Sequence, residues 1–96
     1  NPDDLKRIVE VGILSFENKD YETSQKSFDL IVENTNDSKT KLQAQTYLLR
    51  ISNEQASTKN ELNEVDKKFQ ELLDQYGYSG STINLQIAYA HFLSYS

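Results

Sequence analysis

Residues 5–32 read LKRIVEVGILSFENKDYETSQKSFDLIV, and apolar residues recur in this segment every three or four positions. That spacing is the period of an α-helix, not the alternation of a half-buried strand. Between the two apolar stretches lies the short polar turn Asn18-Lys19-Asp20, and aspartate is a residue type that caps helix starts. The segment therefore predicts two helices, at about 3–18 and 20–35, joined by a tight turn.

The helical period continues to the end of the chain and predicts three further helices. Asp37 or Ser38 can cap the third of the five. Thr58 is followed three residues later by Glu61, which is the pattern of a capping box, so the fourth helix is expected to begin there. The expected ranges are about 39–55, from Thr58 to Gly77, and 82–95.

Terminal signals support these boundaries. Asn1 is expected to cap the first helix, with Pro2 at its first position, where a missing N–H is tolerated. Gly77 is expected to end the fourth helix in a left-handed conformation, which costs glycine little because it has no side chain.

The second and fourth predicted helices superpose on one another. Phe28 falls on Phe69 and Ile31 falls on Leu72 when the two segments are aligned. Each of these helices follows another with its own apolar stripe, so the repeating unit is a helix pair. A single pair cannot bury its apolar face, which predicts that successive pairs stack and that Phe28 and Phe69 are buried.

Residues 5–38 resemble a tetratricopeptide repeat, at that family's length of about 34 residues. The matching positions are Ile8, Val11-Gly12 and Phe16 in the first helix, the turn Asn18-Lys19-Asp20-Tyr21, and Ser24 and Phe28 in the second helix. The resemblance implies that Gly12 lets the neighbouring helix approach closely. The chain departs from the family pattern with Ile8 for tryptophan, Ser15 for tyrosine and Asn36 for proline.

The rest of the chain resembles the same family less closely. Residues 39–77 resemble a degenerate second pair with Thr46 at the glycine position, and residues 82–95 resemble a first helix or a half-a-tetratricopeptide element. The resemblance implies an all-α fold of about five helices, in antiparallel pairs stacked as a short right-handed superhelix. We expect a single domain over 1–96, with helix pairs 3–36 and 39–77 and an unpaired helix 82–95, as a fragment of a longer protein.

Composition and motifs argue against an enzyme. The chain has no cysteine and a single histidine, His91, so neither thiolate chemistry nor a histidine-based metal site is expected. There is no glycine-rich phosphate loop and no nucleophile motif. The acid pairs Asp3-Asp4 and Glu61-Glu64 lie in first helical turns, where the helix dipole accounts for them. No catalytic residue, cofactor or metal is expected.

Charge and hydropathy restrict the partners. The net charge is −5, with 10 basic and 15 acidic residues, which argues against binding to a nucleic-acid backbone. No apolar run reaches the length of about 20 residues that a membrane span needs. The expected partner is another protein or the remainder of the parent chain, and a cytoplasmic location is expected.

The first helix is apolar around most of its circumference, although a terminal helix should leave one face polar. One side is expected to pack on the second helix, while Val9, Ile13 and Phe16 point elsewhere. Three explanations remain open: a groove for a partner segment, packing against preceding repeats, or contact with this chain's own later helices. Val9 and Ile13 stand where chaperone-binding tetratricopeptide domains carry a lysine and an asparagine, so a carboxylate clamp is not expected.

The last helix offers a second candidate surface. Tyr89, Phe92, Leu93 and Tyr95 have no following helix to cover them, and we expect part of this surface to be covered by something outside the chain. The expected function is a non-catalytic interaction or scaffold module that binds an apolar or helical segment of a partner in a multiprotein assembly. The alternative is a purely structural stacking segment with no ligand of its own.

Overall fold

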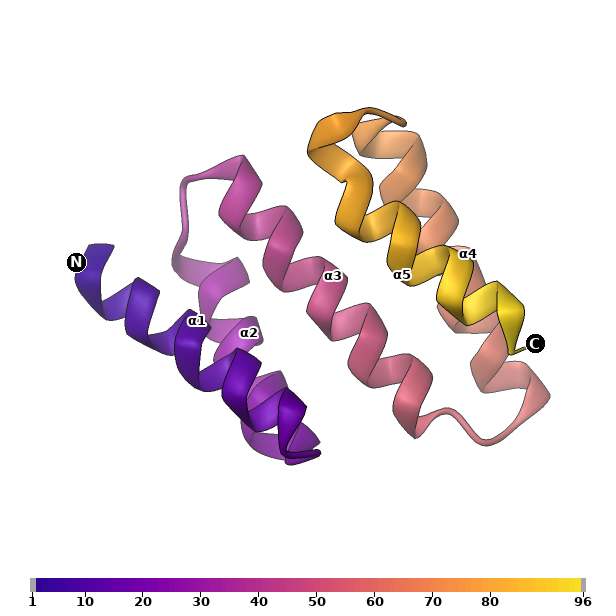
Figure 1. Ribbon diagram of the computed structural model, residues 1–96, viewed down its shortest axis with the longest axis horizontal. Coiled ribbons are helices and arrows are strands. Elements are labelled where there is room, and N and C mark those ends of the chain that lie inside the picture. Colours follow the sequence, from indigo (N-terminus) through magenta and orange to yellow (C-terminus); the bar gives the residue numbers. More distant parts are fainter. Residues whose placement is uncertain (1, 96) are drawn as a thin grey trace. The chain divides into compact units, whose positions relative to one another are not determined.

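The computed structural model describes residues 2–95, which contain five α-helices, one short 3-10 helix and no strand (Figure 1). The elements are α1 (Pro2–Glu17), α2 (Tyr21–Asn34), α3 (Ser38–Gln55), α4 (Lys59–Tyr76), η1 (Gly80–Thr82) and α5 (Ile83–Ser94). The predicted all-α class is therefore confirmed, and the five helices begin and end within a residue or two of the predicted positions.

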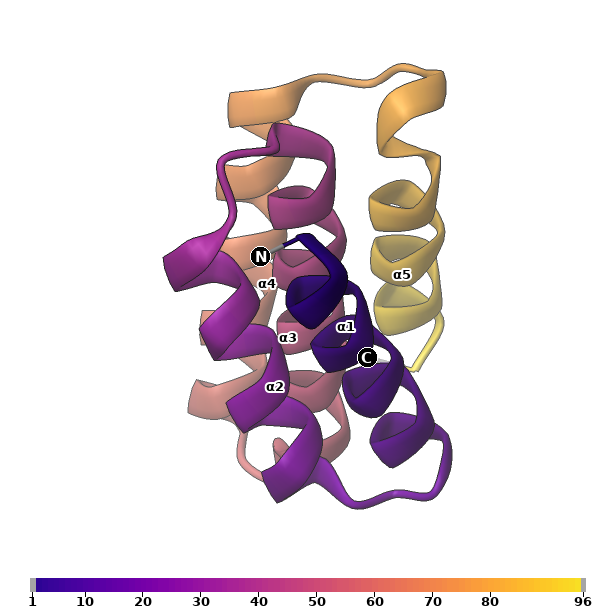
Figure 2. The ribbon, with the colours of Figure 1, turned by 90° about the vertical axis from the view of Figure 1, so that its left-hand side faces the viewer.

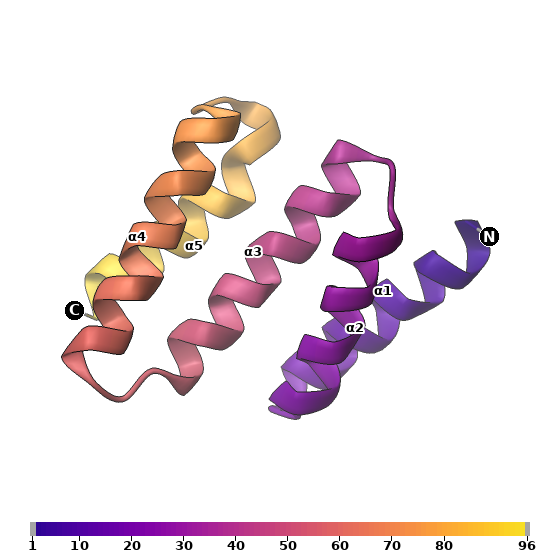
Figure 3. The same cartoon turned by 180° about the vertical axis from the view of Figure 1, so that it is seen from behind.

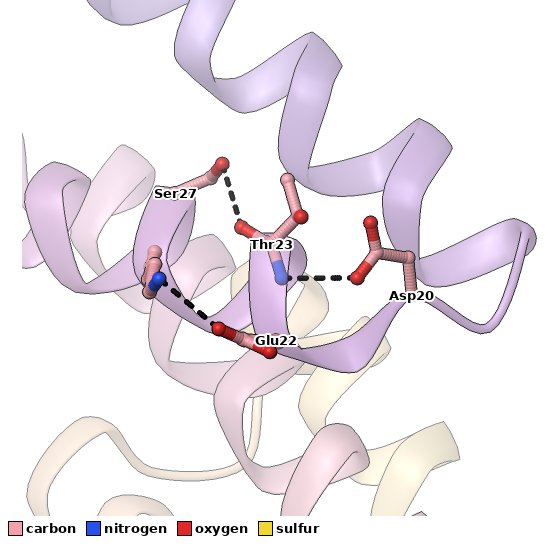
Figure 4. Close-up of polar contacts among 5 residues, drawn as sticks. Asp20, Glu22, Thr23 and Ser27 are labelled. Atoms are coloured by element: carbon pink, nitrogen blue, oxygen red, sulfur yellow. Dashed lines mark hydrogen bonds and ion pairs between the residues drawn. The ribbon is translucent and has the colours of Figure 1, made fainter.

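Three predicted helix starts are confirmed by their hydrogen bonds. The Asp20 carboxylate accepts from the backbone N–H of Thr23 at 3.2 Å, at the start of α2 (Figure 4). Of the two candidate caps for α3, Asp37 is the one used, because it accepts from the Thr40 N–H at 3.0 Å. Thr58 and Glu61 form the expected capping box of α4. The predicted cap Asn1 lies outside the described residues, and α1 begins at Pro2 as expected.

The turn between α1 and α2 contains a strained residue. Lys19 has φ 63°, in the left-handed region that glycine usually occupies. Its N–H donates to the carbonyl of Phe16 at 3.0 Å, and the next N–H, of Asp20, donates to the carbonyl of Ser15 at 2.8 Å. This is the hydrogen-bond pattern of a Schellman motif, which ends α1 and turns the chain into α2.

Gly77 ends α4 with φ 79°, the positive value expected, but with ψ 179°. The backbone of Gly77 is therefore extended at ψ, and the prediction of a left-handed (αL) conformation is wrong. Its N–H still donates to the Leu73 carbonyl at 2.7 Å, so the last turn of α4 is closed.

The chain divides into two compact units, whose described residues are 2–51 and 52–95. The division falls inside α3, so most of this helix belongs with α1 and α2. The predicted pair 39–77 is thus divided between the two units, and its assignment as one repeat stays a prediction.

In the first unit, α1 and α2 pack side by side as an antiparallel hairpin, and α3 packs on this hairpin parallel to α1 (Figures 1 and 2). The buried centre consists of Phe28, Ile31, Ala44 and Ile51. Apolar side chains of α1 surround this centre, namely Leu5, Ile8, Val9, Ile13 and Phe16. The helical spacing of these residues along α1 is what places them on one side of the helix.

Gly12 lies at a close approach between α1 and α2. A Cβ atom at this position would lie 2.8 Å from two ring carbons of Phe28, closer than real contacts allow. The Ser24 hydroxyl donates to the Gly12 carbonyl at 2.8 Å, which also requires the two backbones to be close. The close-packing task expected of this glycine is therefore confirmed.

In the second unit, α5 packs antiparallel against α4 (Figure 3). The rings of Phe69, Tyr89 and Phe92 form a cluster, with centroids 5.1 Å apart for Phe69 and Tyr89 and 5.6 Å apart for Phe69 and Phe92. The connection between the helices is closed by Thr82, whose hydroxyl donates to the Gly77 carbonyl at 2.9 Å. Phe28 and Phe69, at 0% and 1% exposure, are both buried as predicted.

Candidate functional site

A cleft of about 580 Å³ lies at one end of the first unit, where α1, the α2–α3 loop and the start of α3 meet. Leu5 and Val9 of α1 form the apolar part of its lining. The polar part consists of Lys6, Asn34, Thr35, Asn36, Asp37, Thr40 and Gln43. The volume lies in the usual range of ligand clefts, although the lining has more polar residues than most such clefts.

The polar side chains of this lining are not equally available for binding. Asp37 already accepts two hydrogen bonds from Thr40, from the backbone N–H at 3.0 Å and from the hydroxyl at 2.6 Å. These bonds lower the pKa of Asp37, so its charge serves the helix start. The side-chain amide of Asn34 donates to the Leu30 carbonyl at 2.8 Å. Among the described residues, by contrast, the side-chain amides of Asn36 and Gln43 find no hydrogen-bond partner.

Val9, Ile13 and Phe16, which the sequence placed on a separate side of the first helix, are half-buried. All three pack against the buried centre, to which α3 contributes Ala44 and Ile51. Contact with a later helix of the same chain, one of the three explanations, therefore accounts for part of their apolar character. Only Val9 also lines the cleft.

Phe16 belongs to an aromatic cluster at the other end of α1. Its ring lies 5.6 Å from that of Tyr21 and 5.5 Å from that of Tyr47, both edge-on. Tyr47 in turn stacks on Phe28, with the ring centroids 4.7 Å apart. The exposed Arg50 covers this cluster, with its guanidinium carbon 4.5 Å from the Phe16 centroid and 4.9 Å from the Tyr47 centroid. Such contacts orient the guanidinium through its attraction to the ring faces.

The α5 residues of the second candidate surface divide into two groups. Phe92 is 3% exposed and Tyr89 is half-buried, and both rings pack with Phe69 in the second unit. Phe92 is therefore core, not accessible surface. Leu93 and Tyr95 are exposed, at 50% and 79%. The Tyr95 ring lies edge-on to His91, with the centroids 4.8 Å apart.

Tyr89 also makes the polar contact that joins α5 to α4. Its hydroxyl donates to the Asp66 carboxylate at 2.5 Å, and the Gln70 amide donates to the same oxygen at 3.0 Å. The bond from Tyr89, and then that from Gln70, lowers the pKa of Asp66. The hydrogen bond with Asp66 also raises the pKa of Tyr89, because it favours the protonated phenol.

Several exposed apolar residues, and also Gln43 of the cleft and Arg50 of the aromatic cluster, were not among the sequence candidates. Val11 and Leu14 are 46% and 58% exposed on α1, and Ile83 and Ile87, four residues apart, are 49% and 59% exposed on α5. Gln43 stands 34 residues after Val9, and Arg50 stands 34 residues after Phe16. This spacing is the repeat length of the family that the sequence resembles. That spacing is the signal that could have identified them.

In residues 2–95, no group of three or more His, Cys, Asp or Glu side chains is placed to hold a metal ion. Over the same residues, no helix combines the length and the apolar character needed to cross a membrane. The cleft and the exposed apolar side chains of α1 and α5 are the remaining candidate binding surfaces.

Comparison with known proteins finds no matching family model, no matching curated protein and no matching solved structure.

Proposed function

We propose that this chain is a non-catalytic protein-interaction module of the tetratricopeptide type, which binds an apolar segment of a partner in a multiprotein assembly. The observation that carries the proposal is the cleft between α1 and α3, whose lining combines the apolar Leu5 and Val9 with the uncommitted side-chain amides of Asn36 and Gln43. A protein segment offers both kinds of group that such a lining can bind, apolar side chains and backbone amides.

The family assignment within this proposal rests on packing in the first unit. The Phe28 ring leaves no room for a Cβ atom at Gly12, as expected for the glycine of this repeat. α1 and α3 run parallel with α2 between them in sequence. Val9 and Gln43, which are 34 positions apart, both line the cleft, and Phe16 and Arg50, also 34 positions apart, are in contact. The proposed partner is not an acidic chain end held by a lysine–asparagine clamp, because Val9 and Ile13 occupy those positions.

Affinity capture from a cell lysate tests the proposal with three baits: the wild-type chain, Val9→Asp and Val11→Asp. Val11 provides a matched control, because it lies on the same helix but outside the cleft and is 46% exposed. We expect the same proteins on the wild-type and Val11→Asp baits and their loss from Val9→Asp. Thermal unfolding checks that Val9→Asp is folded at the capture temperature. Identical captures on all three baits would contradict a binding role for the cleft.

A purely structural segment is the second candidate, and the exposed Val11, Leu14, Ile83 and Ile87 favour it. Val11 with Leu14, and Ile83 with Ile87, stand one helical turn apart, so each pair forms an apolar patch that a neighbouring repeat can cover. If neighbouring repeats cover α1, Val11→Asp should disrupt the assembled protein more than Val9→Asp does. Size-exclusion chromatography of the assembled protein that carries each variant distinguishes the two functions.

A further inference from the structure

We propose that α5 carries a self-association surface, on which two copies of this chain pack their α5 helices antiparallel around a two-fold axis. The surface consists of Ile83, Ile87, Ala90 and Ser94, the outward stripe of α5. These residues belong to the second unit and none of them lines the cleft of the first unit, so the proposal goes beyond the interaction function proposed above. It follows from the spacing of the stripe, its lack of charge and the sizes of its side chains.

The outward stripe faces away from the core of the second unit. At about 100° per residue, its four residues fall within roughly 60° of one another around the helix axis. The middle of the stripe lies opposite Leu85 and Phe92, which are 1% and 3% exposed. The two isoleucines of the stripe are 49% and 59% exposed, and its two small residues are exposed as well. α5 is therefore apolar on two opposite sides, and the chain covers only one of them.

The spacing of the outward stripe is typical of a helix that pairs with another helix. Its successive residues are separated by four, three and four positions, which is the heptad spacing of the contact positions in a coiled coil. This spacing keeps the contact residues of two helices facing each other over successive turns. The stripe therefore favours a helix as its occupant.

Charge indicates that this helix comes from a second copy. The 10 basic and 15 acidic residues of the chain all lie within residues 1–74, so α5 alone among the described helices carries none. Depletion of charge is typical of the centre of a protein interface. Two copies that each carry −5 repel one another, and at α5 they can meet without placing acidic side chains together. A face without charges also offers nothing that would select a charged partner.

The sizes of the side chains favour an antiparallel pair. A two-fold axis between Ile87 and Ala90 places Ile87 of each copy opposite Ala90 of the other, and Ile83 opposite Ser94. Each branched side chain then meets a small one, and the layers along the contact are filled evenly. In a parallel pair, layers of two isoleucines would alternate with layers of two small residues and leave gaps. The stripe is therefore complementary to itself in the antiparallel direction.

The size of α5 sets the expected strength of the dimer. The helix has 12 residues, so the contact is about 18 Å long and about 10 Å wide. This contact is smaller than the roughly 800 Å² per partner that stable interfaces bury. We therefore expect a reversible dimer with a dissociation constant of roughly 0.1–1 mM.

Sedimentation equilibrium tests the proposal with wild type, Ile87→Glu and Leu14→Glu at concentrations from about 10 μM to 2 mM. Leu14 of α1 provides a matched control, because it is 58% exposed and Ile87 is 59% exposed. We expect wild type and Leu14→Glu to dimerise equally. Ile87→Glu should dimerise at least roughly tenfold more weakly, since the two-fold axis places two uncompensated charges in the contact. Circular dichroism checks that both variants keep the wild-type helix content.

Disulfide cross-linking tests the antiparallel direction, and the chain has no cysteine of its own to interfere. Ile83→Cys and Ser94→Cys are oxidised separately and as an equal mixture, and mass spectrometry identifies the linked chains. We expect the mixture to give more mixed disulfide than random pairing, because positions 83 and 94 of different copies are neighbours. Each variant alone should link poorly, because its two cysteines lie about 16 Å apart along the helix and a disulfide spans about 7 Å at most.

Three outcomes would overturn the proposal. A wild-type chain that stays monomeric over the whole concentration range would show that α5 is not a self-association surface and that its outward stripe is left for a different protein. Equal weakening by Ile87→Glu and Leu14→Glu would place the contact outside α5. Efficient cross-linking within each cysteine variant alone would exclude the antiparallel pair. None of these results changes the lysate capture by the cleft, so the interaction function is tested separately.

Discussion

At the scale of the residue, Lys19 occupies a backbone conformation that disfavours any residue with a side chain. Its φ of 63° is unfavourable for a side chain with a Cβ, and glycine is the usual residue at this point of a Schellman motif. We expect Lys19→Gly to raise the free energy of unfolding by about 0.5–1 kcal/mol, measured by urea denaturation. Lys67→Gly, the same change inside α4, should lower it by about 1 kcal/mol. If both substitutions changed the free energy of unfolding in the same direction, Lys19 would not be in the left-handed conformation.

At the scale of the elements, the Tyr89–Asp66 hydrogen bond joins α5 to α4 and makes their contact depend on pH. The lowered pKa of Asp66 means that the folded chain binds fewer protons than the unfolded chain near pH 4, the ordinary carboxyl range. Its contribution to stability is thus present above about pH 4 and is lost as the pH falls further. The raised pKa of Tyr89 means that the same contact is lost as the pH rises past about 10.

Thermal unfolding between about pH 5 and pH 2 measures this contribution. Asp20, Asp37 and Glu61 also have lowered pKa values from their capping bonds, so the wild-type unfolding temperature should fall with pH. Asp66→Asn and Tyr89→Phe should each make this fall shallower, and the double variant should add little to either. If the unfolding temperature of Tyr89→Phe fell with pH as steeply as that of the wild type, Tyr89 would not be the group that lowers the pKa of Asp66.

At the scale of the whole molecule, two compact units each bury one of the equivalent phenylalanines, Phe28 and Phe69. Changing either to alanine should cost about 3–5 kcal/mol of unfolding free energy, because each leaves a cavity. Amide hydrogen exchange should show the protection of α1 and α2 lost first in Phe28→Ala, and that of α4 and α5 lost first in Phe69→Ala. Tyr78→Ala, at a 72% exposed site, should change stability by less than about 0.5 kcal/mol. If both variants lost amide protection equally in all helices, the chain would unfold as one cooperative unit.

The helices were predictable because their signals act over a few residues. The capping bonds of Asp20 and of Thr58 with Glu61 join residues three positions apart, and the apolar period needs no knowledge of the neighbouring helices. Gly12 was predictable for a different reason, since the repeat pattern identified it as a position where α2 comes too close for a side chain.

The candidate surfaces were predicted less well, because helical period shows which residues share a face but not what covers that face. On the nearly all-apolar α1, Val9, Ile13 and Phe16 pack against the first unit's core while Val11 and Leu14 are exposed. On α5, Phe92 is buried and its neighbour Leu93 is half exposed. The sequence by itself determined the helices, their caps and the close approach at Gly12. Tertiary packing alone decided which apolar faces are covered and brought Arg50 onto Phe16, since these contacts join residues far apart in the chain.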